Sequence, residues 1–465
     1  MRSFVSNNIN NSLHLASICF AAVLASAAQA TNWYVTQSGA GRANGTSLAN
    51  AWSLTTFNSS SAPIAGDTVV FSGPFTSRII PVKGGSASAR VTLDMTAATL
   101  SSSGVRLSIQ ASYLTINGGT MTAASAGDQI DFNYTQQHDV TINGWTFVAR
   151  ETGVTNFLYC KNCYNLLVSN CHLDNSTLVF GDSILNHDIT IRNNWVRSPI
   201  GNGSDNELDV IKFGDAYNVT IEGNYLESQA VSYSGNGHQD IIQNYTKGGS
   251  NPGSPYNWVL RYNYLVMNDH TGGSGDNSFL MLQGMSGSPA LACYSNVFLV
   301  ASTADTGNNG IVVSRNEPGG IYYFHNNTVI RHSSAGNNTI RFEDTGTLYA
   351  ENNVCMADPG VGGTGVSWTM ARGVWDHNFF YGFPAADSND AGPNGLINID
   401  PLFGDFFGDD FSLRPASALI GRGNKIGSLY AFGIAPGATW PNPTLAPRSS
   451  GTWDIGAYQS GTPTP

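Results

Sequence analysis

The sequence predicts an all-β protein, a right-handed parallel β-helix of about ten or more coils with capped ends. Three observations predict it: a nine-residue motif that returns every 23 to 39 residues, a composition rich in Asn, Ser, Thr and Gly, and no helical periodicity between the motif copies. Charged residues are 11% of the 465-residue chain, against about 25% in a typical globular domain. Gly alone contributes 52 residues, and Gly is a poor helix former.

The repeat itself reads YLTINGGTM from residue 113, DVTINGWTF from 139, DITIRNNWV from 188 and NVTIEGNYL from 218, and six further copies follow. Successive coils of a β-helix lie about 4.8 Å apart, so like residues stack on like. Asn tolerates the left-handed conformation that a bend needs, and stacked amides can bond along the axis. A β-propeller is the main alternative, but blades of about 40 residues do not fit spacings of 23 to 26. The copies share one turn position, occupied by Gly119, Trp145, Cys171, Asn194, Asn224, Asn263, Asn296, Asn327, Asn353 and Asn378. The seven consecutive asparagines from Asn194 to Asn378 predict a ladder of stacked amides at that bend.

The predicted organisation starts with a signal peptide over residues 1–30, because an apolar stretch over 15–27 is followed by a small-x-small cleavage pattern ending at Ala30. We expect a secreted or periplasmic protein without a membrane span, since the apolar stretch is shorter than the ~20 residues that a span needs. An N-terminal cap and the first coils follow over 31–110, the repeats over 111–400, a C-terminal coil and cap over 401–459, and a disordered tail over 460–465. The Pro-rich stretch 435–447 should wrap the last coil.

The net charge excludes one class of partner, and the cysteine positions allow one disulfide and predict two core residues. The net charge is −11, which argues against nucleic acid as a partner. An exported chain meets oxidising conditions. Cys160, Cys163 and Cys171 are close enough in sequence to include one disulfide, whereas Cys293 and Cys355 occupy apolar strand positions typical of a core.

The candidate functional residues gather in the middle coils. The intervals between ladder positions widen to 30, 39, 33 and 31 residues between 194 and 327, and insertions in a solenoid map to loops on one face, often the binding face. The segments LDVIKF and QDIIQN align there, so Asp209 should stack on Asp240, and Lys212 on Gln243. Whether Asp209 and Lys212 share a face depends on a bend that the sequence leaves open.

We predict a polar cluster on these coils, in an otherwise charge-poor chain. The alternative is that its members are ordinary polar residues of turns and strand faces. Carboxylates are the oxygen ligands that Ca²⁺ prefers, and three of them together need a cation nearby, either Ca²⁺ or Lys212. The candidates are Lys212, His238, Asp209 and Asp240 as catalytic residues, Gln243, Arg315, Tyr233 and Tyr245 as substrate-binding residues, and Glu207, Asp209 and Asp240 as ligands of a Ca²⁺ ion.

Aromatic side chains concentrate near the same coils and would suit a sugar-binding groove, because their flat apolar faces match pyranose rings. The group comprises Tyr225, Tyr233, Tyr245, Tyr256, Trp258 and Tyr264. Three of them, Tyr225, Trp258 and Tyr264, lie inside the repeat motif, where a core or stacking position is the expected one.

The two ends of the chain resemble a known family. NWYVTQSGAGRANGTSLANAW from residue 32, IDPLFGDFFGDDFSLRPASALIGRG from 399 and DIGAYQ from 454 are similar to the ends of exported bacterial right-handed parallel β-helix proteins of the polysaccharide lyase, or pectin-lyase-like, type. The resemblance implies a carbohydrate-active protein whose partner is an extended acidic polysaccharide, but fold alone does not choose the chemistry.

Among those chemistries we expect a polysaccharide lyase that cleaves a uronic-acid polymer by β-elimination. Such an enzyme needs a base, for which Lys212 or His238 is the candidate, and a group that neutralises the substrate carboxylate. The alternatives are a glycoside hydrolase that uses Asp209 and Asp240, and a non-catalytic polysaccharide-binding or adhesin β-helix.

Overall fold

The computed structural model describes residues 30–460 apart from several short gaps, and the statements below concern the described residues. The gaps are residues 103, 124–126, 133–135, 150–154, 182–185, 200–207, 230, 234–238, 246–255, 269, 273–277, 302–310, 314–319, 333–337, 343–345, 359–363, 369–370, 384–387, 449–450 and 452. The signal peptide prediction therefore falls outside the described residues, apart from Ala30. No helix in the described part of the chain is long and apolar enough to cross a membrane.

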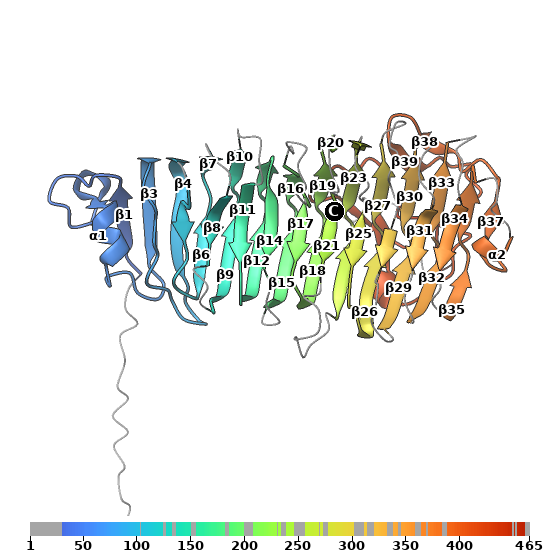
Figure 1. The fold of residues 1–465 in the computed structure, drawn as a ribbon, viewed down its shortest axis with the longest axis horizontal. Helices are drawn as coiled ribbons and strands as arrows, with labels where there is room; N and C mark the ends of the chain where they lie inside the picture. Colours follow the sequence, from blue (N-terminus) through green and yellow to red (C-terminus); the bar gives the residue numbers. More distant parts are fainter. Residues whose placement is uncertain are drawn as a thin grey trace, which may run out of the picture.

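The chain forms a right-handed parallel β-helix, as predicted, in which three series of short strands repeat along one axis (Figure 1). The first series is β6 (Leu114–Asn117), β9 (His138–Asn143), β12 (Tyr164–Ser169), β15 (Asn186–Arg192), β18 (Ala216–Glu222), β22 (Trp258–Arg261), β26 (Gly287–Tyr294), β29 (Gly320–His325), β32 (Thr347–Glu351) and β35 (Ala371–Asp376). Each of these strands pairs in parallel with its counterpart one coil on.

The second series follows the first after a short bend. It consists of β7 (Thr120–Ala123), β10 (Thr146–Ala149), β13 (His172–Asp174), β16 (Trp195–Arg197), β19 (Tyr225–Ser228), β23 (Tyr264–Met267), β27 (Val297–Val300), β30 (Thr328–Arg331), β33 (Val354–Ala357), β36 (Phe379–Tyr381) and β37 (Leu396–Ile397). Together with β1 (Asn32–Thr36), β2 (Trp52–Ser53), β3 (Thr68–Phe75) and β4 (Val91–Ser102), the first two series make a sheet of 25 strands among the described residues.

The third series forms a separate sheet of ten described strands. They are β5 (Leu107–Ser108), β8 (Gly127–Asp131), β11 (Thr155–Cys160), β14 (Thr177–Phe180), β17 (Ile211–Phe213), β21 (Ile242–Asn244), β25 (Leu280–Leu282), β28 (Ile311–Val313), β31 (Asn338–Phe342) and β34 (Thr364–Trp368). Between the second and third series, β20 (Val231–Tyr233) pairs with β24 (His270–Gly272) in parallel.

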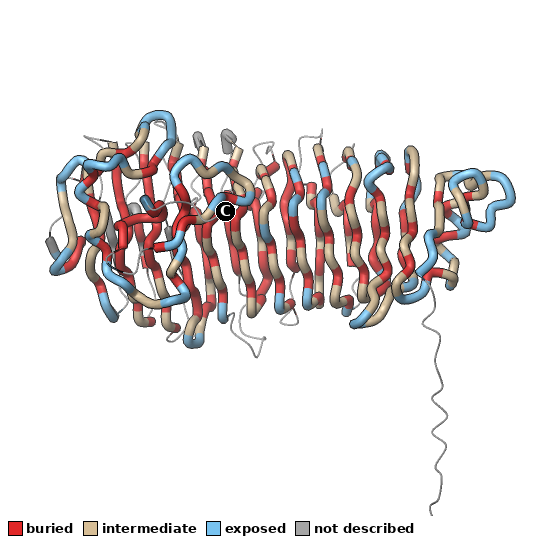
Figure 2. Tube along the Cα trace, turned by 180° about the vertical axis from the view of Figure 1, so that it is seen from behind, coloured by how far each residue is buried: buried red, intermediate tan, exposed pale blue. Residues whose placement is uncertain are grey.

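The core fills the inside of the coils, because alternate residues of each strand point inward (Figure 2). One inward row of the first series contains Ile116, Ile142, Val168, Ile191, Ile221, Leu260, Cys293, Phe324 and Ala350, all nearly inaccessible to solvent. Trp258 is also buried, and its indole N–H donates to the Ala216 carbonyl at 2.9 Å, which confirms the expected core position.

The predicted asparagine ladder is present at the bend between the first and second series. Asn224 is typical: its Nδ2 donates to Asn263 Oδ1 and to the Ile191 carbonyl, each at 2.9 Å, and its backbone N–H donates to the same Oδ1 at 3.0 Å. The same three bonds recur at Asn194, Asn263, Asn296, Asn327 and Asn353. Every polar atom of these buried amides is therefore paired, as burial demands.

The left-handed residue of this bend is not the ladder Asn, which corrects our expectation. The residue immediately before it has positive φ in each coil: Asn193, Gly223, Tyr262, Ser295, Asn326, Asn352 and His377, with φ between 53° and 65°. The ladder Asn is thereby turned inward, where its amide can reach the next coil.

The N-terminal end is covered by the short helix α1 (Leu54–Ser59), whose Leu54 and Phe57 are buried against the core. Cys160 and Cys163, at the end of β11, form a disulfide, one of the pairings that the sequence allowed. Cys171, Cys293 and Cys355 are buried thiols, and burial raises the pKa of all three.

The C-terminal segment, residues 398–460, does not close the last coil but returns along the side of the solenoid (Figure 1). It includes two antiparallel strand pairs, β38 (Phe403–Asp405) with β39 (Asp410–Leu413) and β40 (Phe432–Ile434) with β41 (Leu445–Pro447). The contacts run backward along the axis: Asn424 Nδ2 donates to Glu351 Oε1 at 2.8 Å, Arg448 to Ser295 Oγ at 3.2 Å, and the Asn442 N–H to the Gly223 carbonyl at 2.8 Å. The prediction that residues 435–447 wrap the last coil was therefore wrong.

The reason lies on the outer face of the second series. One outward row changes from charged to apolar along the axis: Asp174, Arg197 and Glu227 are followed in register by Val266, Leu299, Ile330 and Met356. The apolar members form a second buried cluster with residues of the C-terminal segment, among them Phe403, Phe411, Trp453 and Ile455. Burial of this apolar area holds the segment on the middle and late coils.

Candidate functional site

The polar cluster predicted from the sequence lies on the third sheet, at β17 and β21. Lys212 and Gln243 are register partners on the outward row of that sheet, and Val179 and Met281 precede and follow them. The predicted stacking of Lys212 on Gln243 is confirmed. Lys212 keeps 22% of its side-chain surface exposed, whereas Gln243 is buried at 4% exposure.

The two aspartates stack as predicted, but inside the protein. Asp240 donates its backbone N–H to Asp209 Oδ1 at 2.8 Å, and Ser278 donates its own to Asp240 Oδ1 at 2.8 Å. Both carboxylates are buried, with exposures of 1% and 0%. One oxygen of each therefore fixes the bend that enters the next strand of the third sheet, much as the Asn ladder fixes the other bend.

The charged ends of Lys212 and Asp209 lie close together, although Asp209 is buried and Lys212 is partly exposed. A bend at Val210 separates them, and Lys212 Nζ lies 3.9 Å from Asp209 Oδ2. The same Nζ lies 4.9 Å from the centre of the Tyr245 ring. A carboxylate and an aromatic face both attract a cation, so this environment stabilises the ammonium form of Lys212 at the protein surface.

Two polar side chains beside this cluster, Asn244 and Gln239, were not among the sequence-based candidates. Asn244 takes an inward position where its register partners are Phe213 and Leu282, and its Nδ2 donates to the Gln283 carbonyl at 2.8 Å. Gln239 is fully buried and hydrogen-bonds Ser198 Oγ. The signal for Asn244 was available, because a polar residue interrupts an apolar row there.

The remaining candidates cannot be placed. Glu207, His238 and Arg315 lie outside the described residues, and so does the side chain of Tyr233, whose backbone belongs to β20. The described residues contain no group of three His, Cys, Asp or Glu side chains that could hold a metal. The Ca²⁺ site thus stays a prediction that depends on Glu207, since Asp209 and Asp240 each commit one oxygen to a backbone amide.

A second surface feature is a groove of 620 Å³ on the outer face of β9, β12, β15, β18 and β22. Its floor is one register row of the first series, Thr141, Leu167, Thr190, Thr220 and Val259. Five coils at about 4.8 Å per step span about 19 Å along the axis. The groove therefore has the length of a few sugar units of an extended polymer.

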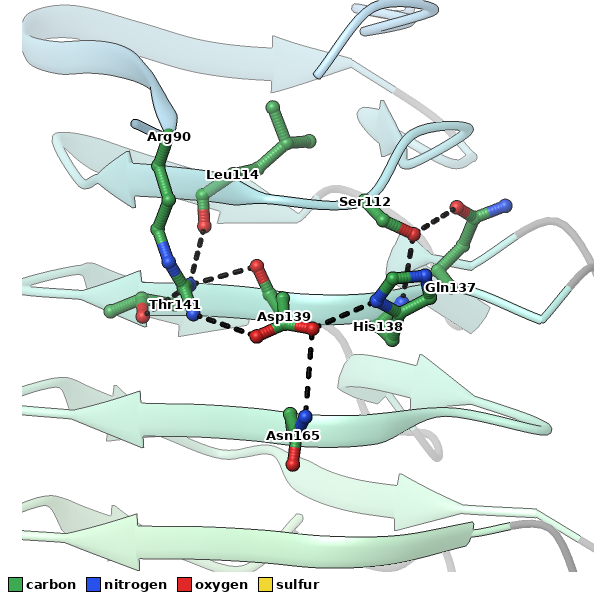
Figure 3. Close-up of polar contacts among 8 residues, drawn as sticks. All are labelled: Arg90, Ser112, Leu114, Gln137, His138, Asp139, Thr141 and Asn165. Atoms are coloured by element: carbon green, nitrogen blue, oxygen red, sulfur yellow. Dashed lines mark hydrogen bonds and ion pairs between the residues drawn. The ribbon is translucent and has the colours of Figure 1, made fainter. Parts of the chain in front are cut away.

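A polar network around Asp139 includes Arg90, Thr141 and Asn165, which line this groove (Figure 3). Arg90 reaches across two coils and meets Asp139 Oδ1 at 3.2 Å and Thr141 Oγ1 at 3.3 Å. Asp139 Oδ2 is 2.8 Å from His138 Nδ1 and accepts a hydrogen bond from Asn165 at 3.5 Å. The sequence contains a signal for this network, because His-Asp or Tyr-Asn pairs open five successive copies of the first strand.

Aromatic rings stack in two columns along the axis. The first contains His138, Tyr164, His187, Tyr217 and Tyr256, with ring centroids 4.6 to 5.1 Å apart. The second contains His172, Trp195, Tyr225 and Tyr264. Inside a column each ring stacks on the ring of the next coil. The predicted stacking positions of Tyr225 and Tyr264 are therefore confirmed. Tyr256, at a column end and 41% exposed, leaves part of its surface open.

Comparison with known proteins finds only solved structures of low sequence identity. No family model matches the chain, and no curated protein matches it in sequence. The GH136 lacto-N-biosidase from Eubacterium ramulus is 12% identical over 74% of this chain and 68% of that chain, with a TM-score of 0.43. Pectate lyase Pel9A is 14% identical over 93% and 96%, with a TM-score of 0.38, and XylC in complex with xylose is 11% identical over 80% and 87%, with a TM-score of 0.41. Similarities at this level assign neither a family nor an activity to the chain.

Proposed function

We propose that this β-helix is a carbohydrate-active enzyme, a polysaccharide lyase that cleaves a uronic-acid polymer by β-elimination on the outer face of the third sheet. The observation that carries the proposal is the position of Lys212: a partly exposed ammonium, held between Asp209 and Tyr245, on the coils with the longest insertions. A long solenoid also suits an extended polymer.

The chemistry needs the substrate carboxylate neutralised before the C5 proton can leave. Lys212 as an ammonium, with the Gln243 amide one coil on, would bind that carboxylate and stabilise the enolate-like transition state. A base then takes the C5 proton, the C4–O bond breaks, a C4–C5 double bond forms, and the leaving oxygen takes up a proton. His238, whose ordinary pKa is near 6.5, would serve as that base. Lys212 is the other candidate for the base only as a neutral amine, and Gln243 alone would then bind the substrate carboxylate.

The hydrolase alternative depends on Asp209 and Asp240. A retaining glycosidase needs two carboxylates about 5–5.5 Å apart that reach the sugar. Asp209 and Asp240 are stacked on neighbouring coils, which favours a hydrolase. Both are buried, however, and each accepts a hydrogen bond from a backbone amide, which argues against a hydrolase. The lyase is therefore the better supported of the two.

The test is product analysis on a panel of acidic polysaccharides, with detection of the C4–C5 double bond by ultraviolet absorbance and mass spectrometry. We expect unsaturated oligosaccharides, lost in Lys212→Ala and in His238→Ala while thermal unfolding is unchanged. Asp131→Ala is the matched control, because Asp131 belongs to the same outward row three coils earlier. Saturated products that disappear in Asp209→Asn or Asp240→Asn would establish the hydrolase, and wild-type rates in both Ala variants would remove the proposed site.

A bound Ca²⁺ is part of the same proposal, with Glu207, Asp209 and Asp240 as its ligands. Calorimetry on metal-stripped protein should show a binding heat for Ca²⁺ that Glu207→Gln abolishes. No heat, together with unchanged activity in chelator, would leave Lys212 as the cation that balances these carboxylates.

A further inference from the structure

A separate cavity of 530 Å³ lies between the C-terminal segment and the outer face of β19, β23 and β27. Two sides come from the solenoid, through Tyr225, Tyr264 and the apolar pair Val266 and Leu299, and the opposite side comes from residues 408–410 and 437–440. It belongs to the second series of strands, whereas the Lys212 cluster belongs to the third sheet. This cavity therefore has no part in the function proposed above.

Three aromatic rings form an angular wall of this cavity. The Tyr225 and Tyr264 rings are stacked at 5.9 Å, and the Trp440 ring meets Tyr264 at 4.9 Å and an angle of 60°. Trp440 is fixed in this orientation, because its indole N–H donates to the Tyr262 carbonyl at 2.8 Å. The Tyr225, Tyr264 and Trp440 rings therefore give the cavity an electron-rich aromatic lining, of the kind that attracts a cation.

Two carboxylates, Asp409 and Asp410, complete the lining, and the described lining residues include no Lys, Arg or His. Of the basic groups nearby, Arg197 pairs with Asp174 at 2.7 Å, outside the lining. His332 lies 3.1 Å from Asp358 and 3.4 Å from Asp409 itself, so it balances part of the charge of Asp409 and none of the charge of Asp410 through a direct contact. Burial, reinforced by Asp409 and Asp410, raises the pKa of the Tyr264 phenol, as expected where the local potential is negative.

We propose that this cavity binds an organic ammonium group, carried by a sugar-sized ligand such as a deacetylated amino sugar. The aromatic wall and the two carboxylates both favour a cation, and the floor of Val266 and Leu299 favours an organic one over a hydrated metal ion. A volume of 530 Å³ lies within the range of small-molecule sites, about 300–1,000 Å³. Uronates, the substrates proposed for the other face, carry the wrong charge for this cavity.

Isothermal titration calorimetry on the full chain tests the proposal with four probes: glucosamine oligomers, N-acetylglucosamine oligomers of the same length, choline and glucuronate. We expect binding of the glucosamine oligomers that weakens with added salt, and at least tenfold weaker binding of the N-acetylated and anionic probes. Choline binding as tightly as glucosamine would keep the ammonium site and assign its natural ligand to a non-sugar source. No heat with either amine, or equal heats for glucosamine and N-acetylglucosamine oligomers, would overturn the proposal.

The charge-neutral variant Asp409→Asn/Asp410→Asn separates a binding role from a structural one. Asn tolerates the positive φ of 61° at position 409, and its Oδ1 can still accept the Ser412 N–H that Asp410 accepts at 3.0 Å. We expect a loss of at least tenfold in glucosamine affinity with unchanged thermal unfolding. Asp405→Asn, in the same hairpin but outside the lining, should bind as the wild type does. Unaltered glucosamine affinity in the double variant would show that the two carboxylates do not contribute to binding of the ammonium group.

Discussion

At the ladder bend, a single Asn side chain hydrogen-bonds both the preceding coil and the following coil. Each ladder Asn donates backward to a carbonyl and forward to the next amide, and its own Oδ1 accepts two N–H groups from the preceding coil. Asp209 and Asp240 do half of this at the other bend, because a carboxylate can only accept. The sequence predicted both stacks from their spacing. It could not separate a carboxylate that holds a backbone amide from one that meets a substrate, since both uses place Asp at a bend.

Removal of one ladder amide should be costly. Asn263→Ala leaves the Asn224 N–H and the Ile221 carbonyl without buried partners, and each such group costs about 1–3 kcal/mol. We expect the free energy of unfolding, measured by urea denaturation, to fall by about 2–4 kcal/mol. Thr220→Ala, on the outer face of the neighbouring strand, should change it by less than about 0.5 kcal/mol, and an equal loss in both variants would contradict a special role for the ladder.

His325 should make the stability dependent on pH. Burial lowers its pKa to about 3, and its Nδ1 accepts the Glu351 N–H at 3.2 Å, so the folded ring is neutral. The unfolded chain protonates this ring below about pH 6.5, so stability is lost as the pH falls from about 6.5 toward 3, by up to about 1.4 kcal/mol per pH unit. His325→Asn should lose less stability between pH 6.5 and 4.5 than the wild type in urea unfolding. The exposed His172→Asn should keep the wild-type slope, and an unchanged slope in His325→Asn would refute this account.

In the strands of the second series, the outward-facing residues change in polarity where the C-terminal segment covers them. Their inward residues are apolar except for the buried Ser228 and Arg331. The outward row, in contrast, turns from Asp174, Arg197 and Glu227 to Val266, Leu299 and Ile330 where the C-terminal segment lies. This change of pattern was visible in the sequence, yet the repeat period describes only contacts along the axis. It does not say which distant segment covers an outer face.

A buried charge in that row should release the C-terminal segment. Ile330→Glu places an unpaired carboxylate under the segment, which costs about 3–5 kcal/mol. We expect early proteolysis after residue 397 and a lower midpoint of thermal unfolding. Val148→Glu changes the same row before the segment begins and should remain resistant. Equal protease resistance of the two variants would mean that the segment does not depend on this contact.

At the scale of the whole molecule, the early coils differ from the middle and late coils in the segments that they contact. The strands of the early coils that the structure describes pair only with those of the adjacent coils, as is usual in a repeat protein, and Arg90 reaches one coil further. Middle and late coils also contact a segment that reaches from Asn352 to Gly223. The fold class and ladder register followed from the sequence because they are periodic, while this long-range contact did not.

Deletion of one coil should therefore be tolerated in one region and not in the other. Removal of residues 120–145, one 26-residue repeat, should give a folded protein with cooperative unfolding by circular dichroism, because the flanking strands keep the same register rows. Removal of residues 328–353, also 26 residues, shifts the later coils by about 4.8 Å against the C-terminal segment and should yield insoluble or protease-sensitive protein. Equal behaviour of the two deletions would show that the segment imposes no register.

The return of the C-terminal segment also has a consequence for biosynthesis. Val266 leaves the ribosome nearly two hundred residues before Ile455, its partner in the second apolar cluster. At translation rates of about 5–20 residues per second, the apolar stripe of the nascent solenoid waits about 10–40 s for its cover. Wherever folding takes place, coils that form before the C-terminal segment docks expose this apolar row to solvent, so aggregation is a risk until the last sixty or so residues are in place.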